Sequence, residues 1–209
     1  MLFNIILIVH VITGSIGLIL GTIITLRKKG DKLHKLIGKF FALAIVITGL
    51  SAFFLSYVHP NLFLFIVGVF TIYLSVSGYR MIQLKKVHLG QKPHLFDALL
   101  SSMMLFCSFI FFYKAIEDVI DKSLFGLVLI LFGMLSMRLC YIDFTAYTGK
   151  ITDKKYGLKN HIGRMTGAYI AAFTAFLVVN NTFLPPVLAW SLPGLIGGVF
   201  ITRSIRKFN

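Results

Sequence analysis

The chain has 209 residues, of which 57% are hydrophobic and only 13% are charged. This composition is too apolar for a soluble domain, whose surface must be covered by polar groups. The formal net charge of +14 would suggest a nucleic-acid partner in a soluble protein. In a chain this apolar, the same charge has to be assigned to loops at a membrane surface before it can indicate a partner.

Seven apolar runs of about 20 residues follow one another along the chain, the length that crosses a hydrocarbon core of roughly 30 Å. Each run is expected to be helical, because irregular backbone is not tolerated facing lipid. The pattern predicts an all-α membrane protein, a seven-transmembrane-helix bundle that forms one integral membrane domain over residues 1–209. The helices are expected near 3–26, 35–57, 62–84, 95–116, 123–141, 162–180 and 185–204.

The first run, MLFNIILIVHVITGSIGLILGTIITL, differs from a signal peptide. It has no basic residue ahead of it and no small-x-small cleavage pattern, and it is long enough to span the bilayer. We expect it to stay attached as the first membrane helix.

The basic residues are distributed asymmetrically between the two sides of this bundle. Nineteen of the 21 lysines and arginines lie in or beside the first, third and fifth gaps or at the C-terminus, and only Lys114 and Lys122 lie on the other side. The positive-inside rule then places the N-terminus outside and the C-terminus in the cytoplasm of a bacterial cell, in a multi-pass protein of the cytoplasmic membrane. The expected partners are the lipid bilayer and its anionic headgroups at the cytoplasmic face, and no nucleic acid is expected.

Motifs that would indicate a reaction are missing from the sequence. The two cysteines, Cys107 and Cys140, fall at different depths and form no CxxC pair, so neither a disulfide framework nor a zinc site is expected. No GxSxG, HExxH or Walker pattern occurs, and the last apolar run has no mid-membrane lysine for a retinal Schiff base. No catalytic residue, metal site or cofactor is therefore predicted, and enzyme activity is not indicated.

Small residues recur at helix-packing spacings in three runs, where they allow neighbouring backbones to approach closely. Pro185 and Pro186 suit a first helical turn, Pro193 is expected to kink the last helix, and Trp190 is expected near the outer membrane interface. The small residues are Gly17 and Gly21, then Gly163, Gly167, Ala171 and Ala175, and finally Gly194 and Gly198.

Two similar segments, KLHKLIGKFF from residue 32 and KNHIGRMTGAY from residue 159, mark the most distinctive feature of the sequence. Aligning residue 37 with residue 162 gives an offset of 125, which is compatible with a weak parallel 3+1+3 repeat of the helices. Each segment places a histidine, His34 or His161, where a basic loop becomes a membrane helix. We expect both histidines to open helices at the cytoplasmic face.

Three interpretations of this histidine pair stay open. The histidines can be structural, bonded to loops or headgroups; they can line a site for an anion; or they can hold a metal together with Asp97 or Asp143. The surrounding lysines and arginines would repel a cation, which favours an anion such as phosphate or a lipid headgroup over a metal. The candidate ligand-binding residues are His34, Lys39, His161 and Arg164.

Four further polar residues within apolar runs are candidates for burial inside the bundle, because a charged or imidazole side chain facing lipid is costly. They are His10, Asp97, Arg138 and Asp143. An ion pair between Asp97 and Arg138 is one expectation, and extension of Arg138 to the membrane interface is the other. No two histidines share a mid-membrane depth, so the usual bis-histidine haem arrangement is not expected.

The order of these features resembles a bacterial family of predicted multi-pass membrane proteins, the domain-of-unknown-function 2306 family. The segments that carry the resemblance are LIVH at 7–10, KKGDKLHKLIGKFF, NLFLFIVGVFTIYLSVSGYR, FGMLSMRLCYIDF, KNHIGRMTGAYIAAFTAFLVVN and AWSLPGLIGGVFITRSIRKF. The resemblance covers nearly the whole chain and implies a compact polytopic bacterial membrane protein. It implies no activity, because none is established for the family.

The sequence therefore leads to one functional hypothesis and two alternatives. The hypothesis is a non-enzymatic integral membrane protein that binds or transports a small or lipidic anionic ligand at its cytoplasmic face. One alternative is a membrane redox or metal-dependent protein that uses its histidines, and the other is an accessory subunit of a membrane complex.

Overall fold

The computed structural model describes residues 1–208 and, within them, consists of helices and loops without any strand. Seven of the helices are long and apolar enough to cross a membrane, which confirms the prediction of an all-α protein with seven helices of membrane-spanning length. Asn209, the last residue of the expected domain, lies outside the described residues. The helices are α1 (Leu2–Leu26), α2 (Lys32–Val58), α3 (Leu62–Met81), the short 3-10 helix η1 (Val87–Leu89), α4 (Leu95–Ile120), α5 (Phe125–Tyr147), α6 (Tyr156–Val179) and α7 (Pro186–Arg206).

Two helices extend further toward their shared loop than the apolar runs predicted. α5 continues to Tyr147 instead of ending near 141, and α6 begins at Tyr156 instead of near 162. Hydropathy marks the part of a helix that crosses lipid, whereas the hydrogen-bonded helix continues into the polar region. The expectation that His34 and His161 both open helices is therefore wrong for His161, which is the sixth residue of α6, while His34 is the third residue of α2.

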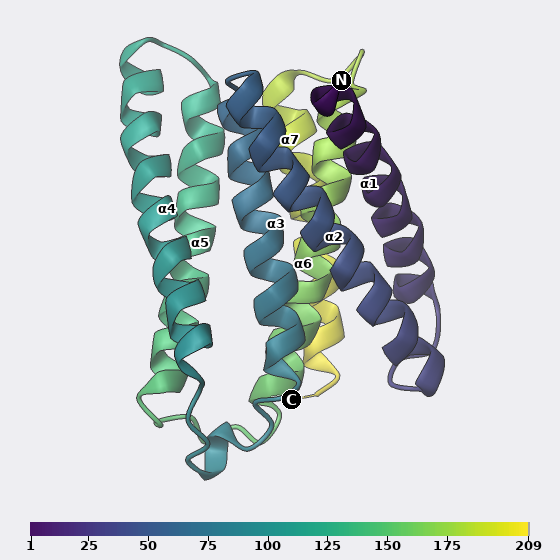
Figure 1. Cartoon of the computed structure of the whole chain (residues 1–209). Coiled ribbons are helices and arrows are strands. Elements are labelled where there is room, and N and C mark those ends of the chain that lie inside the picture. The colour runs from purple at the N-terminus through teal and green to yellow at the C-terminus, as the bar shows by residue number, and fades with distance from the viewer. Residues whose placement is uncertain (209) are drawn as a thin grey trace.

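Successive helices run in opposite directions, so the loops alternate between the two ends of the bundle (Figure 1). The loops at 27–31, 82–94 and 148–155 and the C-terminus lie at one end, which we call the basic end because it contains most of the lysines and arginines. The N-terminus lies at the opposite end. The helix bounds do not test the parallel repeat, which stays a prediction.

The central helix is α3, which packs against α2, α4 and α6. α4 and α5 form a close antiparallel pair at one side of α3, and α1 lies at the other side against α2 (Figure 1). Buried apolar side chains from α2 to α6 fill the space between these helices, among them Phe41, Phe70, Met104, Phe132 and Ala168. Trp190, expected near the outer membrane interface, is the fifth residue of α7 and is buried against Phe125 and Phe132.

Some of the small residues permit close helix contact and others do not. A Cβ atom added to Gly21 would lie 2.3 Å from the Tyr169 ring, and one added to Gly78 would lie 2.9 Å from Cβ of Arg164. Nothing lies within 4 Å of such an atom at Gly194 or Gly198, so close helix contact at these two positions does not require glycine. The contact that the glycine at 78 permits brings α6 against α3 and places Arg164 inside the bundle.

Candidate functional site

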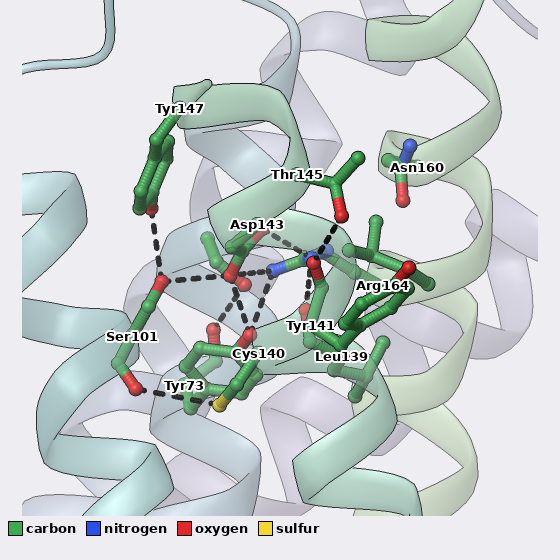
Figure 2. A network of polar contacts seen from close by, with 12 residues as sticks. Tyr73, Ser101, Leu139, Cys140, Tyr141, Asp143, Thr145, Tyr147, Asn160 and Arg164 are labelled. Carbon is green, nitrogen blue, oxygen red and sulfur yellow. Dashed lines mark hydrogen bonds and ion pairs between the residues drawn. The ribbon is translucent and has the colours of Figure 1, made fainter. Parts of the chain in front are cut away.

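The centre of the site is a buried ion pair between Asp143 on α5 and Arg164 on α6, each with 1% of its side chain exposed. Nη2 of Arg164 donates to Oδ1 of Asp143 at 2.5 Å, and Nη1 donates to Oδ2 at 3.1 Å. The guanidinium and the carboxylate thus meet at two points (Figure 2). This is the geometry in which arginine recognises a carboxylate most strongly.

Two hydroxyl groups from other helices donate to the same carboxylate. Tyr73 on α3 donates from Oη to Oδ2 of Asp143 at 2.6 Å, and Ser101 on α4 donates from Oγ to the same oxygen at 2.7 Å. Because the Ser101 proton is used in this way, the 2.9 Å contact between Ser101 and Tyr147 has the Tyr147 hydroxyl as its donor. Donors from α3, α4 and α6 therefore converge on one carboxylate on α5 (Figure 2).

Further contacts hold the guanidinium of Arg164 in place. Its Cζ atom lies 5.4 Å from the centroid of the Tyr73 ring, within range of a cation–π interaction. Nη1 also donates to the Tyr73 hydroxyl at 3.1 Å, and Nη2 lies 3.4 Å from the carbonyl oxygen of Leu139. Only Nε, which is buried, has no hydrogen-bond partner among the described residues.

The site lies inside the bundle but nearer to the basic end. With a rise of 1.5 Å per residue, Tyr73 and Arg164 are roughly 12 Å from the loop ends of their helices, and Ser101 is roughly 9 Å from the start of α4. Ionisable residues at such positions in membrane helices are expensive and usually functional.

A second ion pair lies between this site and the basic end. Arg80, near the end of α3, donates from Nε and Nη2 to the two carboxylate oxygens of Asp97 on α4, each at 2.7 Å. Asp97 also accepts from the backbone N–H of His94 at 2.9 Å, and in this way it caps the first turn of α4. Asp97 is therefore buried, as predicted. Its partner is Arg80, whereas the expected ion pair was with Arg138.

The expectation that Arg138 is buried is wrong. Arg138 is exposed on α5, and the aspartates with which it could have paired, Asp97 and Asp143, pair with Arg80 and Arg164 instead. An arginine on a lipid-facing helix surface can extend its long side chain to the headgroups, which avoids the cost of burying its charge. Interfacial extension, the second expectation for Arg138, agrees with this exposure.

His10 is half-buried at the interface of α1 and α2. Its Nδ1 lies 3.1 Å from the carbonyl oxygen of Thr48 and 3.0 Å from Oγ of Ser51. Because a carbonyl oxygen only accepts, Nδ1 is the protonated nitrogen. His10 thus links α1 to α2, and the site around Asp143 is formed by other helices.

Two of the four predicted ligand-binding residues bond to different groups, and the structure does not gather all four in one site. Arg164 faces Asp143, whereas His161 donates from Nδ1 to the carbonyl oxygen of Gly78 at 2.8 Å. Lys39 is exposed on α2. His34 is half-buried near the start of α2, and its Nδ1 is buried without a hydrogen-bond partner among the described residues. Of the four, only Arg164 lies in the buried polar site.

The loop before α2 shows how acidic residues are held at the basic end. Asp31 caps the helix by accepting from the backbone N–H of His34 at 2.6 Å, and it pairs with Arg27 at 2.5 Å. The hydrogen bond from His34, followed by the charge of Arg27, holds the pKa of Asp31 below its usual range. The pKa of Asp153 is lowered in the same direction, chiefly by the hydrogen bond from Lys159.

Sequence reasoning missed several members of the site: Tyr73, Arg80, Ser101 and Tyr147. A signal for Arg80 was available in the order of the helices. Arg80 lies one residue before the end of α3, and Asp97 lies two residues after the start of α4, so antiparallel packing of these helices brings both residues to the same end of the bundle. Tyrosine and serine within apolar runs give no comparable signal, since both residues are common in membrane helices without any shared site.

No group of three or more histidine, cysteine, aspartate or glutamate side chains in residues 1–208 is placed to hold a metal ion. The arrangement around Asp143 holds a carboxylate, to which a guanidinium and two hydroxyl groups donate. Comparisons with protein-family models, with curated proteins and with solved structures give no match. The resemblance to the domain-of-unknown-function 2306 family therefore stays an expectation from the sequence.

Proposed function

We propose that the protein binds a small anion together with a proton at Arg164, and carries both across the membrane. The observation that supports this proposal is the convergence of Arg164, Tyr73 and Ser101 on one carboxylate. A guanidinium and two hydroxyl donors form an anion-binding site, and in the described state the side chain of Asp143 occupies it.

Charge balance inside the membrane explains why a proton has to accompany the anion. At present one buried cation faces one buried anion, and a buried charge without its partner costs about 3–5 kcal/mol. Protonation of Asp143 alone would leave Arg164 unpaired, and entry of an anion alone would place two negative charges beside one positive charge. Binding both together keeps one cation opposite one anion.

The size of the site restricts the anion. The guanidinium and its hydroxyl partners are packed around the Asp143 carboxylate, so an entering ligand has to take the volume that this carboxylate vacates. A carboxylate of one or two carbon atoms fits this requirement. A lipid headgroup is too large for the buried site, and we assign anionic lipids to the surface of the basic end.

The orientation follows from the positive-inside rule. We infer that the basic end faces the cytoplasm of a bacterial cell, that the N-terminus is outside, and that Lys39 and Arg138, both exposed, extend to anionic headgroups. This surface would also raise the local concentration of a small anion near the site.

Formate is a suitable probe, with gluconate at equal ionic strength as an anion too large to enter. Purified full-length protein in lipid nanodiscs is unfolded thermally at pH 5 and pH 8 with increasing concentrations of each salt. Formate should stabilise the wild-type protein more at pH 5 than at pH 8, because the proposed binding takes up a proton together with the anion. At 100 times its dissociation constant, a bound ligand stabilises by about 2.7 kcal/mol.

The variant Asp143→Asn separates this proposal from a purely structural ion pair. Asparagine mimics the neutral carboxyl group, so formate should stabilise this variant at both pH values. Asp153→Asn is the matched control, since Asp153 lies in a loop and pairs with Lys159, and this variant should behave as the wild type does. If formate stabilises Asp143→Asn no more than gluconate does, the proposed function is wrong.

A further inference from the structure

A small cavity lies between the two ion pairs. Its volume is about 10 Å³, and its polar lining comes from α3, α4 and α5. Both aspartates of the two pairs contribute to the wall. The polar lining residues are Ser77, Arg80, Asp97, Ser101, Asp143 and Tyr147.

The cavity has the size and the lining that hold one water molecule. A water needs a cavity of roughly 10–15 Å³ and two to four polar partners, and buried waters are found where otherwise unsatisfied polar groups meet. Apolar cavities of this kind stay empty, but the wall of this one has two carboxylates and three hydroxyl groups that each have a free lone pair.

The Arg80–Asp97 pair lies on the side of the cavity toward the basic end. The Arg80 side chain is 19% exposed and that of Asp97 is 6% exposed, so the pair lies at the boundary between solvent and bundle. On the other side of Asp143, the same helices contribute apolar side chains to the core, among them Phe70, Met104 and Phe132. The polar side chains next to Asp143 in this cavity thus lie toward the basic end, and apolar side chains lie on its other side.

We propose that one buried water occupies this cavity and passes protons between Asp97 and Asp143. A proton that arrives from the basic end neutralises Asp97 and weakens its bond to Arg80. The water accepts this proton from Asp97 and gives one of its own protons to Asp143. An O–H bond breaks at Asp97 and one forms at Asp143, while at the water oxygen one O–H bond forms and another breaks. The water is regenerated, one proton has moved from Asp97 to Asp143, and no electron is transferred.

Charged and titratable groups from four helices surround Asp143. This inference rests on the proposed function for its purpose, because proton delivery is what releases Arg164 for an anion. The titratable or charged groups that surround Asp143 are Tyr73 and Arg80 of α3, Asp97 of α4, Cys140 and Tyr147 of α5, and Tyr156 and Arg164 of α6.

X-ray radiolytic footprinting of the full-length protein in nanodiscs tests for the water directly. Hydroxyl radicals form from a bound water even inside a protein, and they oxidise the side chains beside it. Met81, which lines the cavity and is 3% exposed, should be oxidised several-fold faster than Met104, which is 1% exposed in the apolar core. Tyr147, also in the cavity wall, should be labelled along with Met81.

Two substitutions at one position provide the matched variants. Ser77→Val adds carbon atoms that fill the cavity, whereas Ser77→Ala removes the same hydroxyl without filling it. Both lose the bond from Ser77 to the carbonyl oxygen of Tyr73, so they differ only in the filled volume. Oxidation of Met81 should fall toward the Met104 rate in Ser77→Val and stay fast in Ser77→Ala.

Equal oxidation rates for Met81 and Met104 in the wild-type protein would overturn the proposal, even if Ser77→Val does not fold. Fast oxidation of Met81 that persists in Ser77→Val would overturn it too, since the water would then lie elsewhere. Formate stabilisation is measured on the same preparation. Fast oxidation of Met81 without stabilisation by formate would support the buried water and contradict the proposed anion binding. Stabilisation by formate without fast oxidation of Met81 would support anion binding and contradict the buried water.

Discussion

Asp143 and Arg164 are 21 residues apart in the chain, yet they meet through two hydrogen bonds inside the bundle, with 1% of each side chain exposed. Neither residue could be buried there alone. Taking a charge out of water costs several kcal/mol, and the partner recovers that cost only when the geometry is good and the remaining lone pairs are also bonded. Tyr73 and Ser101 meet the second condition.

The first prediction follows from this dependence of each charge on the other. Arg164→Met should lower the free energy of unfolding by about 3–5 kcal/mol, because it leaves the Asp143 carboxylate buried without a counter-ion. The double variant Asp143→Leu with Arg164→Met should recover most of this loss, since two apolar side chains need no partner. Thermal or denaturant unfolding in a mild detergent measures both effects.

Arg138→Met is the control for these substitutions. Arg138 is an exposed arginine on α5, so its replacement should change stability by no more than about 0.5 kcal/mol. A double variant as unstable as Arg164→Met would show that the ion pair contributes more than mutual charge neutralisation.

The second prediction concerns the partner of Asp97. A double-mutant cycle with Asp97→Asn and Arg80→Gln should give a coupling energy of about 0.5–3 kcal/mol, because two hydrogen bonds of 2.7 Å join these side chains. The same cycle with Arg138→Gln in place of Arg80→Gln should give coupling near zero. Larger coupling of Asp97 to Arg138 than to Arg80 would contradict the described pairing.

The seven membrane-spanning helices could be predicted because bilayer thickness requires a certain length of apolar helix, whatever the details of packing. The pairing of their polar residues could not be predicted in the same way. The Asp97–Arg138 pair, one of the two expectations for Arg138, assumes that α4 and α5 neighbour each other, which they do. The rotation of each helix about its axis determines which residues meet, and hydropathy does not specify that rotation.

The burial of Arg164 illustrates the same limitation. Next to Gly163 in a basic segment, Arg164 suggested a residue at the mouth of a surface site. In the structure α6 begins six residues earlier than its apolar run, and the glycine at 78 lets α6 approach α3, so Arg164 lies within the helix and inside the bundle. The helix extension and the close contact are both tertiary effects that the residue pattern does not determine.

The third prediction tests the close contact of α3 and α6. Gly78→Ala would place a Cβ atom 2.9 Å from Cβ of Arg164 and 3.2 Å from the backbone nitrogen of Met165. Because the second of these atoms belongs to the backbone, α6 has to move away, and we expect a loss of about 1–3 kcal/mol in stability. Such a shift would also lengthen the bonds between Arg164 and Asp143.

Gly194→Ala is the control for this substitution, since no atom lies within 4 Å of the added Cβ. Its stability in detergent should equal or slightly exceed that of the wild-type protein, because alanine favours the helix more than glycine does. Equal effects of the two substitutions on thermal unfolding would show that α3 and α6 are not in close contact at Gly78.

The fourth prediction concerns pH and the start of α2. Accepting the hydrogen bond from the His34 N–H lowers the pKa of Asp31, and the charge of Arg27 adds to this effect. The unfolded chain therefore binds a proton at Asp31 more readily than the folded chain does, so the stabilisation is complete above the ordinary carboxyl pKa of about 4. It is lost as the pH falls through the lowered value, because the neutral carboxyl group is a weaker acceptor. Hydrogen exchange of the His34 amide, corrected for its intrinsic rate, should show protection that decreases in this acidic range.

Asp31→Asn keeps a capping oxygen without a titratable group and should show protection independent of pH there. The same decrease in the asparagine variant would mean that another group titrates at this helix start.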